Sequence, residues 1–100
     1  MVVDGINFPE DQLRALCDLH GVKRLSLFGS GLRGDSNPGS DVDLLVEFHP
    51  GKTPGMLGFG QMILDFEKLL GRRVDLRTLN DLSPYFAPAV AKAARTLHAA

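Results

Sequence analysis

Two aspartates stand at the head of an otherwise apolar segment, in the run Ser40-Asp41-Val42-Asp43 that precedes residues 44–46. On an extended chain, Asp41 and Asp43 point to the same face with Cα atoms roughly 6 to 7 Å apart. Carboxylates that close repel each other unless a cation lies between them, and Mg²⁺ is usually held by one or two carboxylates plus substrate phosphates. The pair therefore predicts a metal site. The alternative is that Asp41 caps the loop and Asp43 lies on a solvated strand face.

The segment just upstream has the composition of a phosphate-binding turn. Gly29 and Ser30 supply backbone N–H groups and a hydroxyl in a tight corner. Arg33 follows in the same turn, where its charge can pair with a triphosphate oxygen or with Asp35 in a structural salt bridge. These residues predict a nucleotide-binding turn beside the aspartates.

The glycines of this turn also match the dinucleotide-binding spacing G-x-G-x-x-G over residues 29–34. That fingerprint requires a full helix immediately afterwards. Residues 35–40 are all turn formers, so an NAD-type site is disfavoured.

A third carboxylate, Asp75, lies in the alternating segment 73–77, which has the period of a strand. About two dozen residues of helical pattern separate it from the strand at 40–46, enough for a right-handed crossover between parallel strands. Parallel strands start at the same edge of a sheet, so Asp75 is expected to join Asp41 and Asp43. Asp75 could also be an ordinary exposed residue.

The elements that must position these residues follow from periodicity and from glycine stops. We predict helices over 10–20, 56–70 and 84–98 and strands over 23–28, 40–46 and 73–77. The connection over 29–40 is too short for a parallel return, so the first two strands should be antiparallel. The predicted fold is of the α/β (α+β) class, a small three-stranded mixed sheet in order 1-2-3 packed by helices. Residues 1–8 are expected to be a loose lead-in with an edge strand at Val2-Val3.

Composition limits the other possibilities. One hundred residues with 11 basic and 12 acidic side chains predict a single domain over 1–100 without the positive field that nucleic-acid binding needs. The single Cys17 is expected to be a small buried hydrophobe. The chain shows neither an apolar run of membrane-spanning length nor a signal sequence, so we expect a soluble, cytoplasmic protein without membrane contact.

Segments 29–34, 40–46 and 74–76 resemble the minimal nucleotidyltransferases of the DNA polymerase β superfamily. The resemblance implies the nucleotidyltransferase fold and transfer of a nucleoside monophosphate from an NTP, with AMP from ATP as the expected case. Asp41, Asp43 and Asp75 would bind one or two Mg²⁺ ions, and Gly29 and Ser30 would bind the phosphates. Gly31-Leu32 departs from the family pattern, in which a large polar residue is often followed by a small one.

The resemblance also implies a partner. Such proteins resemble antitoxins that bind and adenylylate, on a hydroxyl group, a helical toxin of the HEPN class. Two other functions stay open: a binding module that neutralises its partner by complex formation alone, and a nucleotide-binding or metal-binding domain with another reaction, such as nucleic-acid end modification. The alanine-rich segment near the C-terminus could also serve a homo- or hetero-oligomeric interface.

Overall fold

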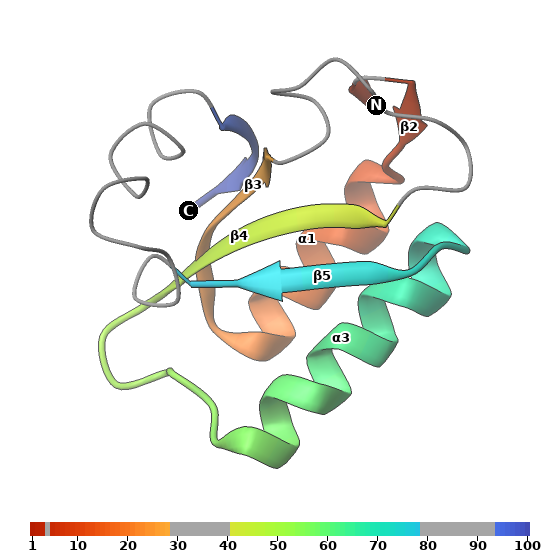
Figure 1. Cartoon of the computed structure of the whole chain (residues 1–100). Helices are drawn as coiled ribbons and strands as arrows, with labels where there is room; N and C mark the ends of the chain where they lie inside the picture. Colours follow the sequence, from red (N-terminus) through yellow and green to blue (C-terminus); the bar gives the residue numbers. More distant parts are fainter. Residues whose placement is uncertain (4, 29–40, 79–93) are drawn as a thin grey trace, which may run out of the picture.

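The computed structural model describes residues 1–3, 5–28, 41–78 and 94–100 (Figure 1). The elements in chain order are β1 (Val2–Val3), β2 (Ile6–Asn7), α1 (Glu10–His20), β3 (Val22–Phe28), β4 (Val42–Phe48), α3 (Met56–Leu70), β5 (Val74–Arg77) and β6 (Arg95–Ala99). The helices predicted over 10–20 and 56–70 are confirmed. Each ends at a glycine in the left-handed conformation, Gly21 with φ 71° and Gly71 with φ 67°, where a side chain would be strained.

The main sheet has the strand order β5-β4-β3-β6. Strands β3 and β4 are antiparallel, whereas β4 and β5 are parallel, as predicted for the three strands recognised in the sequence. Phe28 at the end of β3 pairs with Asp43 near the start of β4. The end of the first strand therefore lies beside the start of the second, as predicted.

The fourth strand corrects the sequence prediction. A helix was predicted over 84–98, but residues 95–99 form β6, which pairs antiparallel with β3; residues 84–93 lie outside the described residues. In β6 the Leu97 side chain is buried in the core, while Thr96 is exposed. Pairing with β6 satisfies the backbone hydrogen bonds along the outer edge of β3, and this outweighs the helical preference of alanine.

Strand β1 confirms the strand predicted at Val2-Val3, but the first residues of the chain are held to the domain more firmly than predicted. Strands β1 and β2 form a small antiparallel hairpin, and the Phe8 N–H donates a hydrogen bond to the Met1 carbonyl at 2.7 Å. The Phe8 side chain is fully buried in the core. Burial of a phenylalanine contributes roughly 2 kcal/mol, so this segment is tied to the domain and is not a loose lead-in.

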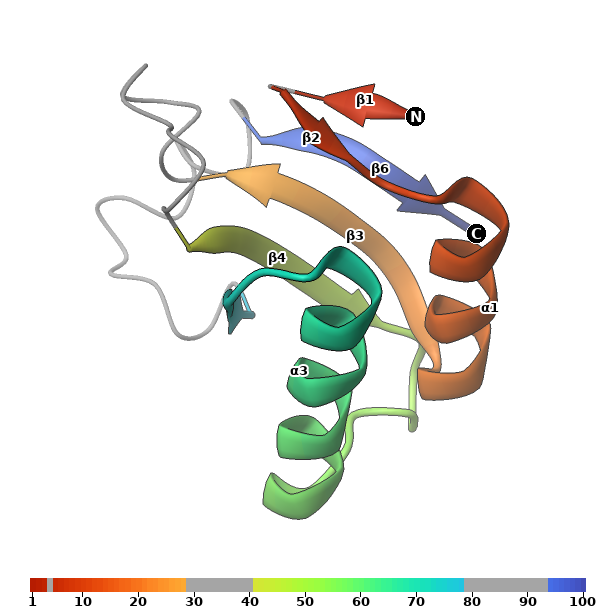
Figure 2. The same ribbon diagram turned by 90° about the vertical axis from the view of Figure 1, so that its right-hand side faces the viewer.

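Helices α1 and α3 lie on the same face of the main sheet (Figures 1 and 2). Leu13 and Cys17 of α1 and Met62 and Phe66 of α3 are buried in one cluster with the strands. The residues of the main sheet in this cluster are Val22, Leu25, Leu27, Val42, Leu44, Val46, Val74, Leu76 and Leu97. Because side chains alternate along a strand, Asp43 and Asp75 belong to the face turned away from the two helices.

None of the helices in the described ranges has the length and apolar character needed to cross a membrane.

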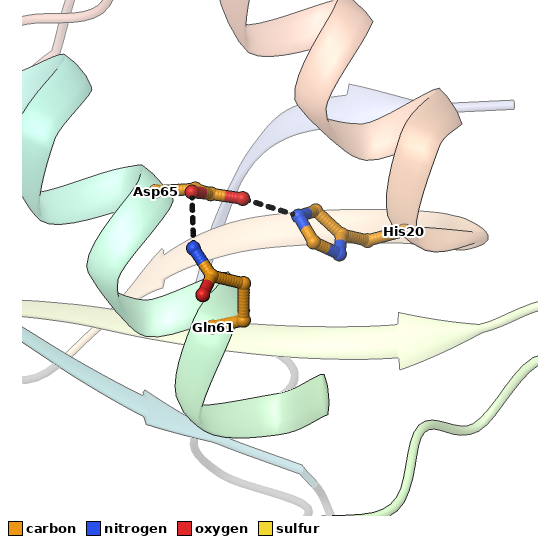
Figure 3. Close-up of polar contacts among 3 residues, drawn as sticks. All are labelled: His20, Gln61 and Asp65. Atoms are coloured by element: carbon orange, nitrogen blue, oxygen red, sulfur yellow. Dashed lines mark hydrogen bonds and ion pairs between the residues drawn. The ribbon is translucent and has the colours of Figure 1, made fainter. Parts of the chain in front are cut away.

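A polar contact joins the two helices at the sheet (Figure 3). Gln61 Nε2 donates to Asp65 Oδ1 at 2.9 Å, and His20 Nε2 lies 2.8 Å from Asp65 Oδ2. An ionised carboxylate can only accept, so His20 is the donor in this contact. The hydrogen bonds from Gln61 and His20, together with the charge of Lys68, lower the pKa of Asp65 below its usual 3.8.

The Asp65 contact should make stability depend on acid pH. The unfolded carboxyl group binds a proton at higher pH than the folded one, so the stabilisation is complete above about pH 4 and is lost as the pH falls through the folded pKa. Asp65→Asn should lower the free energy of unfolding at pH 7 by ~0.5–1 kcal/mol. In urea unfolding, this difference in the free energy of unfolding should shrink toward pH 3. Gln61→Ala, which removes only one of the hydrogen bonds to Asp65, should cause a smaller loss of stability at pH 7. A difference that grows on acidification would contradict the assignment.

The buried Cys17 should be chemically inert in the folded protein. Burial, helped by the neighbouring Asp18 charge, raises the pKa of its thiol to about 12. Since the thiolate is the reactive form, a disulfide reagent at pH 8 should react roughly a thousandfold more slowly than with the unfolded chain. Reaction at equal rates with and without denaturant would show that the α1 packing is wrong.

Candidate functional site

The parallel pairing of β4 with β5 brings two aspartates together. Asp43 and Asp75 are direct partners in the ladder, between Val42–Val74 on one side and Leu44–Leu76 on the other. Partners on adjacent strands lie about 4.8 Å apart and project from the same face of the sheet. Both side chains are partly buried. The structure therefore places two carboxylates side by side, as expected for this pair.

Hydrogen bonds at the start of both strands hold this register. The Val42 N–H donates to the Arg73 carbonyl at 2.8 Å, which joins the beginning of β4 to the residue before β5. The Val74 N–H donates to Glu67 Oε2 of α3 at 2.9 Å. Helix α3 thus fixes the first residue of β5, and with it the position of Asp75.

Of the remaining predicted site residues, the structure describes only Asp41. Asp41 is exposed and immediately precedes β4. Gly29, Ser30 and Arg33 lie outside the described residues, so the phosphate-binding turn stays a prediction. Phe28, the last described residue before Gly29, pairs with Asp43.

Asp75 and Arg77 form a close contact that was not predicted from the sequence. Arg77 Nε donates to Asp75 Oδ1 at 3.2 Å, and Arg77 NH2 donates to Oδ2 at 3.3 Å. Residues two apart on a strand share a face, so the Asp-x-Arg spacing was the signal for this pair. The guanidinium of Arg77 therefore contacts both carboxylate oxygens of Asp75, the residue predicted to bind metal.

The donor set fits a magnesium ion held jointly with a substrate. Within residues 1–3, 5–28, 41–78 and 94–100, no three His, Cys, Asp or Glu side chains are close enough to hold a metal ion. Asp41, Asp43 and Asp75 all lie within these ranges, so the structure does not bring the three together as one metal-binding group, and their joint role as ligands stays a prediction. Asp43 and Asp75 nevertheless supply adjacent hard oxygen ligands, and Mg²⁺ commonly takes one or two carboxylates and completes its shell with phosphates and water.

Known proteins share both the sequence and the fold. The nucleotidyltransferase domain family model matches residues 10–97. A Methanocaldococcus jannaschii protein provisionally named protein adenylyltransferase MJ0435 is 43% identical over 65 residues, covering 65% of this chain and 68% of that protein. The protein adenylyltransferase MntA of Thermococcus cleftensis is 38% identical over 77 residues, covering 77% of this chain and 76% of its own.

Solved structures agree with the family match. A structure provisionally described as a minimal nucleotidyltransferase has a TM-score of 0.69 at 38% identity, with 85% of each chain covered. A toxin-antitoxin complex with AMP-PNP has a TM-score of 0.71 at 21% identity, covering 93% of this chain and 75% of that one. A complex of a tri-AMPylated Shewanella oneidensis HEPN toxin with its MNT antitoxin has a TM-score of 0.64 at 20% identity, covering 91% and 70%. At these lower identities, the two complexes establish the shared fold alone.

The paired carboxylates thus occur in a mixed sheet that this family shares, and the family model covers most of the chain. The chain belongs to the nucleotidyltransferase domain family and is an enzyme of the minimal nucleotidyltransferase type.

Proposed function

We propose that this protein transfers AMP from ATP, with Mg²⁺, to a hydroxyl group of a partner protein. The partner would be a HEPN-domain toxin, and this chain would be its antitoxin. The observation that carries the proposal is the alignment of Asp43 with Asp75 across two parallel strands. Homologues named as protein adenylyltransferases support the choice of reaction.

Each site residue then has a role in the reaction. Asp43 and Asp75, with Asp41, would hold Mg²⁺, which would supply positive charge opposite the negative charge that develops on the α-phosphate and the leaving pyrophosphate. Gly29 and Ser30 bind the β- and γ-phosphates through an N–H group and a hydroxyl, and Arg33 pairs with a phosphate oxygen. Asp75 takes the proton of the acceptor hydroxyl, whose oxygen attacks the α-phosphate as pyrophosphate leaves.

The surface of the described helices supports a protein partner. Met56 and Leu57 at the start of α3 are each 92% exposed, and Leu19 of α1 and Leu64 of α3 are also largely exposed. A bound protein partner would remove such side chains from water, which favours association. We place the reaction in the cytoplasm, where ATP is available.

One observation favours a second candidate, in which the chain neutralises its partner by binding alone. Arg77 already engages both oxygens of Asp75, and among the described side chains no three form a metal-binding group. In this candidate Asp43 and Asp75 have no catalytic role. Neutralisation would then survive loss of both Asp43 and Asp75.

Labelling of the partner distinguishes the two candidates. The protein is incubated with Mg²⁺, ATP labelled at the α-phosphate, and the HEPN-type product of a neighbouring reading frame. We expect label on the partner, reduced at least ~100-fold in Asp43→Asn and in Asp75→Asn, because each change removes a metal ligand.

Glu47→Gln is the matched control, since Glu47 lies on β4 at the same period as Asp43, where it pairs with Arg24 at 3.7 Å. It should label the partner at the wild-type rate. Absence of label on the partner, or full labelling by Asp43→Asn, would contradict the proposed reaction. Neutralisation by an Asp43→Asn/Asp75→Asn variant that transfers no label would favour the binding module.

A further inference from the structure

The carboxylate of Asp75 is already engaged by a cation that belongs to the chain itself. Both of its oxygens accept hydrogen bonds from Arg77, from Nε at 3.2 Å and from NH2 at 3.3 Å. A guanidinium that approaches a carboxylate with two N–H groups matches its planar geometry and carries the opposite charge. The arginine thus occupies the oxygens that a metal ion would need.

The strand geometry directs Arg77 toward Asp75. The two residues are consecutive positions on one face of β5. The partner of Arg77 on β4 is Leu45, a buried apolar residue, so the cross-strand position offers no carboxylate. Asp75, in contrast, has the carboxylate of Asp43 as its neighbour across the ladder. Arg77 therefore adds positive charge next to two adjacent negative groups.

We infer that Arg77 and a divalent cation compete for Asp75, so that Arg77 is a positioning residue that holds this carboxylate until metal and nucleotide arrive. The inference rests on the proposed function, because it assumes that Asp75 is a metal ligand. It adds a regulatory step to that function: metal binding to the free protein requires the guanidinium to leave.

Electrostatics makes the competition reversible. A guanidinium and a divalent ion on one carboxylate repel each other, so both cannot keep full contact with Asp75. The side chains of Arg77 and Asp75 are 47% and 36% exposed, and an ion pair this open to water is weak and separates easily. Arg77 can therefore hold Asp75 in the free protein without preventing metal binding when substrate phosphates add their own ligands.

Binding of Mn²⁺ in the absence of nucleotide tests this competition directly. Free Mn²⁺ is measured by electron paramagnetic resonance for wild type, Arg77→Gln and Arg24→Gln. Arg24→Gln is the charge-matched control: Arg24 lies on β3 and pairs with Glu47 at 3.7 Å, so both substitutions change the net charge equally. We expect Arg77→Gln to bind Mn²⁺ roughly fivefold more tightly than wild type, and Arg24→Gln to stay within about twofold.

Arg77→Lys separates the effect of the two-point contact with Asp75 from the effect of the positive charge. A lysine keeps the positive charge but cannot make the two-point contact, so its Mn²⁺ affinity should fall between those of wild type and Arg77→Gln. Melting temperatures of all variants establish that they are folded. Equal Mn²⁺ affinities for Arg77→Gln and Arg24→Gln would overturn the inference.

Asp43→Asn distinguishes failure of the inference from failure of the proposed function. If Asp43→Asn weakens Mn²⁺ binding while Arg77→Gln leaves it unchanged, the metal site stands and the role of Arg77 is wrong. If Mn²⁺ binding is insensitive to Asp43→Asn and to Arg77→Gln alike, the metal site and the inference both fail.

Discussion

The in-register parallel pairing of β4 with β5 is the constraint on which the rest of this structure depends. It places Asp43 directly beside Asp75, although 31 positions separate them in the chain. The crossover through α3 makes the pairing parallel, and Glu67 of that helix accepts a hydrogen bond from the first N–H of β5. Because side chains alternate along a strand, a slip of one residue would send one aspartate into the core and separate the pair.

Asp43 and Asp75 are adjacent, and the surrounding residues offset the electrostatic repulsion between their carboxylates. On the helix-facing side of the sheet, Val42, Leu44 and Val74 are buried and fix the strands in place. On the other side, Arg77 supplies a positive charge to Asp75. The core therefore supports the strands, while the ion pair of Arg77 with Asp75 stays partly open to water. A preorganised carboxylate pair of this kind suits a reaction in which negative charge must be held in place.

Much of this fold could be predicted from the sequence because its local signals agree with its tertiary contacts. The apolar spacing of α1 and α3 and the glycine after each helix specify the helices, and the short connection before β4 specifies the antiparallel pair. Strand β6 could not be predicted, since the alanine-rich sequence before it favours a helix locally and only the open edge of β3 favours a strand. The Asp75–Arg77 contact was missed because Asp75 was interpreted as a metal ligand, although the Asp-x-Arg spacing on one strand already indicated the pair. The predicted phosphate turn at Gly29 and Ser30 lies outside the described residues.

The measurement that tests the account most directly is the position of a bound metal ion. Crystals grown with Mn²⁺ and a non-hydrolysable ATP analogue would give an anomalous diffraction peak at the manganese. The account predicts a peak within coordination distance of carboxylate oxygens of both Asp43 and Asp75, close to the analogue's phosphates. Nucleotide bound with its metal away from either aspartate would contradict it.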